Sequence, residues 1–143
     1  MSIKIEIAAS VDSELIEVFQ RLTPQLSSSN SGPSKDQLEA IVSSCASTLL
    51  IARIEDRIVG SLTLVTFPIP TGIRAWIEDV VVDSDARGKG VGEALNVFAL
   101  AEAKRLGAIT VDLTSRPSRE AANRLYQRLG FKARETNVYR FTL

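Results

Sequence analysis

The chain of 143 residues contains no histidine and only one cysteine. An internal disulfide needs two cysteines, and the usual transition-metal sites need several histidine or cysteine ligands. We therefore expect neither an internal disulfide nor a bound metal. Cys45 follows Leu38, Ile41 and Val42 at helical spacing, which predicts a buried thiol in a helix rather than a nucleophile.

Net charge and long apolar runs are also missing. Lysine plus arginine and aspartate plus glutamate number 17 each, so no overall field attracts nucleic acid or an anionic membrane. No window reaches the roughly 18 apolar residues of a membrane-spanning helix, and the beginning "MSIKIEIAAS" lacks the pattern of a secretory signal. We expect a soluble, cytoplasmic protein without a nucleic-acid or membrane partner.

Hydrophobic residues make up 45% of the chain, which is enough to bury the core of one domain over residues 1–143. The apolar residues alternate in some segments, as in strands, and recur at helical spacing in others. A capping box, Ser34 with Gln37, marks the start of the second helix. The predicted order is βααβββαβαβ, a mixed sheet flanked by helices. Strands are predicted at 3–7, 48–54, 58–67, 73–82, 108–114 and after Phe131, and helices at about 14–22, 34–45, 90–106 and 118–129.

The sequence "RGKGVG", residues 87–92, lies between a predicted strand and a predicted helix. Glycines at a helix start allow a phosphate to approach backbone N–H groups, so this segment predicts a phosphate site. The P-loop spacing is absent, and the dinucleotide fingerprint fails when counted from Gly88 or from Gly90. Asp112, 22 residues after Gly90, is the one feature that keeps a dinucleotide-binding domain as an alternative.

The same six residues fit the pattern Arg/Gln-x-x-Gly-x-Gly/Ala, and here the chain resembles the GNAT superfamily of acyl-CoA N-acyltransferases. The strand "EDVVV" before the turn and "AANRLYQRLGF" in the last predicted helix extend the resemblance over nearly the whole chain. The resemblance implies an α/β GNAT fold with a central, mostly antiparallel sheet. It also implies acetyl-CoA as cosubstrate and a primary amine as acceptor.

The resemblance assigns a cofactor site to the fourth strand and the turn. It implies that Val80 and Val82 hydrogen-bond the pantetheine amides through their backbones, and that the N–H of Val81 or Val82 polarises the thioester carbonyl. Asn123 is a further candidate, although many relatives place their asparagine where this chain has Arg119. The pyrophosphate-binding candidates are Arg87, Gly88, Lys89, Gly90, Val91 and Gly92.

Two residues are candidates for proton transfer. Tyr126 occupies the position at which the family commonly carries the acid that protonates the departing sulfur. Some relatives carry a glutamate base where this chain has Trp76. Glu78 lies two residues further and is expected on the same side of the strand, with Asp79 on the other side, so Glu78 is the candidate general base.

Two further expectations concern the acceptor amine and the oligomeric state. Glu78, Asp79, Asp83 and Asp85 give the expected cleft a negative charge, which favours a cationic amine such as a polyamine, an aminoglycoside or a lysine side chain. A C-terminal strand in "NVYRFTL" could pair across a homodimer. The rival interpretation of another class is a catalytically silent acyl-CoA-binding or regulatory module.

Overall fold

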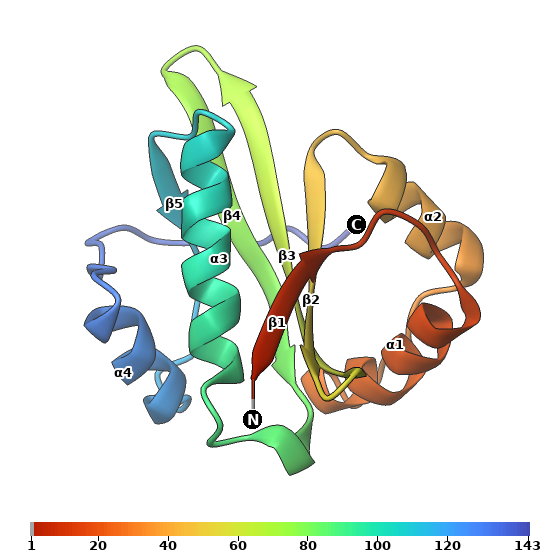
Figure 1. The fold of residues 1–143 in the computed structure, drawn as a ribbon. Coiled ribbons are helices and arrows are strands. Elements are labelled where there is room, and N and C mark those ends of the chain that lie inside the picture. The colour runs from red at the N-terminus through yellow and green to blue at the C-terminus, as the bar shows by residue number, and fades with distance from the viewer. Residues whose placement is uncertain (1) are drawn as a thin grey trace. The chain divides into compact units, whose positions relative to one another are not determined.

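A five-stranded sheet with strand order β1-β2-β3-β4-β5 is the centre of the first part of the chain (Figure 1). The first four strands pair antiparallel, and β5 pairs parallel to β4. The mixed, mostly antiparallel sheet predicted from the sequence is therefore confirmed. The strands are β1 (Ile3–Ile7), β2 (Ser47–Ile54), β3 (Arg57–Ile69), β4 (Gly72–Val82) and β5 (Thr110–Asp112).

The computed structural model describes residues 2–143, which form two compact units, residues 2–113 and 114–143. The first unit holds the sheet and most of the helices, and the second holds one helix and the C-terminal segment. None of the helices in the described residues is long and apolar enough to cross a membrane. The helices are α1 (Ser13–Leu26), α2 (Lys35–Ser43), the short 3-10 helix η1 (Ser84–Ala86), α3 (Val91–Arg105) and α4 (Glu120–Arg128).

Helices cover both faces of the sheet in the first unit. On one face, α1 packs its buried stripe against a cluster that includes Val81 of β4. On the other face, a side chain at Gly60 would meet Val91 and Leu95 of α3. Ser61 pairs with Val81 and Gly60 with Val82, so neighbouring residues of β3 and β4 alternate between the two helical layers. Figure 1 shows α3 along one side of the sheet and α1 with α2 at the other.

Local signals in the sequence are confirmed at several element ends. Ser34 and Gln37 form the predicted capping box at the start of α2. Glu55 and Asp56 both have positive φ in the two-residue turn between β2 and β3, which suits the twist of a tight hairpin. β3 runs on through Pro68 to Ile69, two residues further than predicted, since Pro68 lies near the end of the β3–β4 hairpin, where the loss of one backbone donor is tolerated.

Three local predictions are wrong. Helix α2 ends at Ser43 because Ser44 adopts an extended backbone, so Cys45 lies outside the helix and is exposed rather than buried. Helix α4 was predicted to begin at Ser118 as its cap, but its cap is Arg119, which makes no side-chain cap bond. No strand forms in residues 131–143, because the backbone there pairs with no strand within residues 2–143.

Candidate functional site

Strand β4 contains a bulge next to the residues predicted to bind a cofactor. Thr63 of β3 pairs with Glu78, and Ser61 pairs with Val81, so two residues of β4 face a single residue of β3. Asp79, inside this bulge, has φ of 51°, a left-handed conformation that Asp adopts more readily than most residues. A bulge bends its strand and re-aims the backbone groups that follow it. No local sequence pattern predicts this bulge.

Past Trp76, β4 has a free edge on its β5 side. β5 pairs only with Arg74, Ala75 and Trp76, whereas β4 continues to Val82. Within the described residues, no other strand joins this side of β4. Residues 77–82 thus extend by about 20 Å with one side of their backbone open to a ligand. A free strand edge is what a cofactor bound through the backbones of Val80 and Val82 requires.

The backbone N–H and C=O groups of Val81 and Val82 point in opposite directions. The N–H of Asp83 donates to Val59 O of β3 at 2.7 Å. Since N–H and C=O groups alternate in direction along a strand, those of Val82 point away from β3, and those of Val81 point towards it. The Val82 carbonyl accepts a bond from Arg87 Nε at 3.4 Å, and its N–H faces the free edge. Of the two valines predicted to polarise a carbonyl, Val82 has the suitable direction.

The turn before α3 is exposed, and two of its glycines have left-handed backbones. Gly88 has φ of 76°, and a Cβ added there would meet nothing within 4 Å. Gly90, with φ of 85°, is the N-cap of α3 and has no side chain to cap the helix. The first N–H groups of α3 therefore lack an intrahelical partner and a capping group, which leaves them available to an anion.

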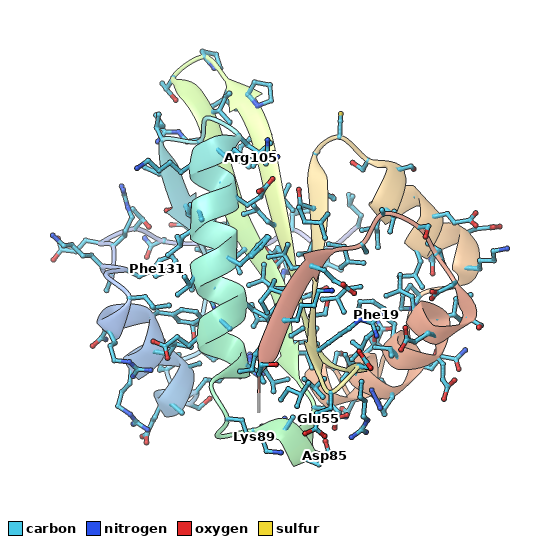
Figure 2. The ribbon with its side chains drawn as sticks, viewed as in Figure 1. Phe19, Glu55, Asp85, Lys89, Arg105 and Phe131 are labelled. Atoms are coloured by element: carbon cyan, nitrogen blue, oxygen red, sulfur yellow. The ribbon has the colours of Figure 1, made fainter. Side chains whose placement is uncertain are left out.

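The remaining residues of the turn divide into buried and exposed side chains. Val91 is buried against the sheet, so only its backbone can reach a ligand. Gly92 lies in the first turn of α3, and its carbonyl accepts a bond from Asn96. Arg87 and Lys89 are exposed, and Figure 2 shows Lys89 in the turn itself. The turn thus combines backbone donors with two exposed positive charges, which suits a polyphosphate.

A buried carboxylate fixes the chain between β4 and the turn to helix α1. Asp83 is 4% exposed, and its Oδ2 lies 3.3 Å from Arg21 Nε and 3.4 Å from Arg57 Nη2. Gln25 donates to Asp83 Oδ1 at 3.3 Å and accepts from the N–H of Ser84 at 2.9 Å. Sequence reasoning missed this network because the side chains that contact Asp83 lie more than 20 residues from it in the sequence, and no local pattern connects them.

The same network changes the electrostatics predicted for the site. Arg57 also donates to Asp85 Oδ2 at 3.1 Å, and this bond holds the pKa of Asp85 below its usual value. Asp83 and Asp85 are therefore balanced by arginines. Of the four acidic residues named from the sequence, only Glu78 and Asp79 have no recorded arginine or lysine partner within residues 2–143.

Glu78 lies on the side of β4 that was predicted for it. Trp76 pairs with Val65 and Glu78 with Thr63, and residues 63 and 65 share a face of β3. That face is the one that α1 and α2 cover, but Glu78 itself is exposed. The placement beside Trp76 is thus confirmed, and the role of Glu78 as a base stays a prediction. Asp79 is exposed in the bulge, where simple alternation of the strand no longer applies.

In the second unit, Tyr126 lies on α4 and is half-buried. Its ring meets Phe131 edge to face with centroids 5.7 Å apart, and its carbonyl accepts the N–H of Phe131 at 2.9 Å. Burial raises the pKa of the Tyr126 hydroxyl above its usual value, while the positive charge of Arg119 acts in the opposite direction. The phenol therefore stays protonated at neutral pH, as a proton donor must.

Asn123 is engaged within its own unit. Its Nδ2 donates to the carbonyls of Arg116 and Arg119, both at 2.9 Å. These bonds fix the start of α4, which has no other side-chain cap. The amide nitrogen of Asn123 thus has a structural task, and only its oxygen remains for the cofactor contact that was predicted.

The features of the first unit together fit an acyl-CoA. An open strand edge ends beside a glycine turn with free N–H groups, as an extended pantetheine arm followed by a pyrophosphate requires. Among residues 2–143, no three His, Cys, Asp or Glu side chains are grouped so that they could hold a metal.

Comparisons with known proteins identify the family. An 85-residue segment is 43% identical to the glucosamine 6-phosphate N-acetyltransferase of Trypanosoma brucei brucei, covering 57% of this chain and 56% of that protein. A 61-residue segment is 39% identical to an uncharacterised N-acetyltransferase of Methanocaldococcus jannaschii, covering 43% of this chain and 27% of that protein. The matches thus span about half or less of the length of each relative.

Among solved structures, a transcriptional regulator from Bacillus halodurans has a TM-score of 0.80 and 27% identity, covering 97% of this chain and 100% of that one. The match to the acetyltransferase (GNAT) family extends over residues 15–131, which include the bulged strand, the glycine turn and α4. The chain belongs to the acetyltransferase (GNAT) family.

Proposed function

We propose that the protein transfers the acetyl group of acetyl-CoA directly to a primary amine. The observation that carries this proposal is the free edge of β4 leading to the uncapped start of α3. The match to an acetyltransferase family supports this proposal, and the matched residues 15–131 extend over both compact units. We infer that residues 1–143 act as one acetyltransferase domain, and a cytoplasmic location stays a prediction.

The turn would hold the pyrophosphate of coenzyme A. The backbone N–H groups of residues 88–92 are the main donors, and the left-handed glycines supply the curvature without a Cβ in the way of the ligand. Arg87 and Lys89 add positive charge from the exposed side of the turn. The buried network around Asp83 keeps the turn in place relative to β4.

The free edge of β4 would hold the pantetheine arm as if it were a short additional strand. Val82 supplies backbone groups that point away from β3, and Val80, at the end of the bulge, is the second proposed contact. The N–H of Val82 faces the free edge, where it can donate to a carbonyl oxygen that becomes more negative during acyl transfer. Bound acetyl-CoA supplies an activated thioester, so no covalent intermediate with the protein is needed.

Tyr126 and Glu78 are the proposed acid and base. The raised pKa of Tyr126 keeps its hydroxyl protonated, so it can donate a proton to the departing thiolate. Glu78, exposed on β4, would accept a proton from the ammonium group of the acceptor, directly or through water, and so produce the neutral amine that attacks the thioester. Asn123 can contribute only its side-chain oxygen to the cofactor.

The acceptor that we propose is a small cationic amine. One relative is a glucosamine 6-phosphate N-acetyltransferase, which supports an amine on a small polar molecule. Fewer carboxylates favour a cation than the sequence suggested, because arginines balance the charges of Asp83 and Asp85. Glu78 and Asp79 remain as the carboxylates that would attract the amine.

A binding or regulatory module is the second candidate. It is favoured by the similarity to a protein described as a transcriptional regulator, which shares the fold over nearly the whole chain. Such a module would keep the glycine turn and the free strand edge, but it would not catalyse acetyl transfer. A dinucleotide-binding domain lacks a comparable observation, because its glycine spacing is absent.

The test is release of free thiol from acetyl-CoA in the presence of an amine panel. The panel includes amino sugars with and without phosphate, a polyamine, an aminoglycoside and a lysine peptide. An acetyltransferase releases thiol with at least one amine and forms the acetylated amine in equal amount. Binding of acetyl-CoA without release for any amine supports the module, and tight binding of NAD without binding of acetyl-CoA contradicts both.

A further inference from the structure

Strand β4 has one covered face and one partly open face. Ala75 and Ile77 are 0% and 3% exposed on the face that α3 covers. On the face of α1 and α2, Arg74 and Trp76 are only half-buried, and Glu78 is exposed. These last three residues alternate with the buried ones, so their side chains lie in a row along one face. A small molecule can therefore reach this row of side chains.

Arg74 is held in this row by two hydroxyl groups. Its Nη1 donates to Thr110 Oγ1 and its Nη2 donates to Thr71 Oγ1, both at 3.0 Å. Thr110 is also the residue of β5 that pairs with Arg74, so the register of the sheet supports this contact. The hydroxyls orient the guanidinium without neutralising its charge, and they leave its other N–H groups available as donors.

The charge of Arg74 has no partner among the carboxylates of residues 2–143. Asp112 pairs with Trp76 from the neighbouring strand, but it forms no ion pair with Arg74. Four other arginines of the first unit pair with carboxylates: Arg21, Arg53, Arg57 and Arg105. A guanidinium that is oriented but not neutralised suits a phosphate or a carboxylate, which it can bind through two parallel hydrogen bonds.

The row of side chains has opposite charges at its two ends. Arg74 and Glu78 are four residues apart, which is about 13 Å along an extended strand. Trp76 lies between them, and its indole offers an apolar surface for a sugar ring or an aliphatic chain. The free edge of β4, with the N–H of Val82, follows on the side of Glu78. An amine at Glu78 would thus be the end nearer to the proposed thioester.

We propose that Arg74 binds an anionic group, a phosphate or a carboxylate, of the molecule whose amine lies at Glu78. The acceptor is then a small amine with a negative charge at its far end, rather than a polyamine. This inference rests on the proposed function for the identity of the bound molecule as an acetyl acceptor. The anion site itself rests on the contacts of Arg74 and on the open face of β4.

Calorimetry with matched pairs of amines tests the site, both without and with coenzyme A. Glucosamine 6-phosphate is compared with glucosamine, and 6-aminohexanoate with 6-aminohexanamide, so that each pair differs in the anionic group. In at least one pair, the anionic member should bind at least about tenfold more tightly, and that pair distinguishes phosphate from carboxylate. Equal affinities within both pairs, or no measurable binding of either anionic amine, overturn the proposal.

Variants of Arg74 locate the site. Arg74→Gln removes the charge but keeps a hydrogen-bond donor, so it should abolish the preference for the anionic amine and leave the affinity for the neutral amine unchanged. Arg74→Lys should keep part of the preference, because it keeps the charge without the planar fork. Lys104→Gln is the matched control, since it removes one positive charge from an exposed side chain of α3, on the other face of the sheet.

Circular dichroism verifies the fold of each variant. An undiminished preference in Arg74→Gln contradicts the site, and so does an equal loss in Arg74→Gln and Lys104→Gln. If Arg74→Gln does not fold, a full preference in Arg74→Lys contradicts the planar, paired contact in the same way.

Turnover separates this inference from the proposed function. In an active transferase, Arg74→Gln should raise KM for the anionic amine and leave kcat and KM for acetyl-CoA nearly unchanged. Binding of the anionic amine through Arg74 without acetyl transfer to any amine would support the anion site and contradict the proposed function. Acetyl transfer without preference for an anionic amine would support the proposed function and contradict the anion site.

Discussion

At the scale of single residues, a substitution of Tyr126 can distinguish an enzyme from a binding module. Its hydroxyl has a raised pKa, and its ring packs against Phe131. Tyr126→Phe removes the proton donor and keeps the ring, so kcat should fall by roughly 10² to 10⁴ with little change in KM for acetyl-CoA. Steady-state kinetics with a verified amine would check this. An unchanged kcat in this variant would show that Tyr126 serves only in packing.

The pH dependence gives a second measurement on the same residue. A proton donor works only while protonated, so kcat should decline as pH rises through the pKa of Tyr126. Since burial raises that pKa, the midpoint of the decline should lie above the usual tyrosine value of about 10. The decline should be absent from the remaining rate of Tyr126→Phe. A decline at the same pH in both proteins would assign it to another group.

Asp83 is the residue on which the position of the turn depends. Asp83→Asn removes the buried charge opposite Arg21 and Arg57, and we expect a loss of about 1–3 kcal/mol in the free energy of unfolding. KM for acetyl-CoA should rise because the turn loses its fixed attachment to α1. Asp85→Asn is the control, since Asp85 is exposed and should affect stability little. Denaturant unfolding and kinetics measure both; equal effects of the two variants would contradict the role of Asp83.

At the scale of elements, the start of α3 and its turn are predicted to act as the phosphate site. Gly90 has a left-handed backbone, which Asn and Asp tolerate better than other residues. Gly90→Asp places a negative charge at the N-cap, where it stabilises the helix but repels a phosphate. Compared with Gly90→Asn, it should bind acetyl-CoA at least about fivefold more weakly, which corresponds to roughly 1 kcal/mol.

Calorimetry of acetyl-CoA binding measures this difference, and thermal melting confirms that both variants fold. The neutral variant controls for the strain and the added volume. Equal affinities of the aspartate and asparagine variants would show that the phosphate does not bind at the start of α3.

Local sequence patterns predicted most elements, because strands and amphipathic helices repeat their apolar residues at fixed periods. The glycine turn and the placement of Glu78 beside Trp76 followed from the same local information. The bulge at Asp79 could not be predicted, since it depends on how β4 pairs with β3. The partners of Asp83 are distant in sequence. The segment after Phe131 was predicted to form a strand, but a strand also needs a paired neighbour, and none pairs with this segment within residues 2–143.

At the scale of the whole molecule, the composition constrains the chemistry. The chain has no histidine and one cysteine, and the described residues contain no group of three metal-ligating side chains. The proposed mechanism uses backbone N–H groups and two side chains. Activity should therefore survive dialysis against a chelator. A loss of activity that a divalent ion restores would contradict this, and a chelator already saturated with calcium controls for effects of the chelator itself.

The consecutive pairing of β2, β3 and β4 has a consequence for how the chain folds. These strands follow one another with short turns, so their contacts close small loops, whereas β1 joins β2 only across residues 8–46. Contacts that are local in sequence form fastest. During refolding, pulse-labelling hydrogen exchange should find the amides of β2, β3 and β4 protected first. β1 would be added once that three-stranded nucleus exists.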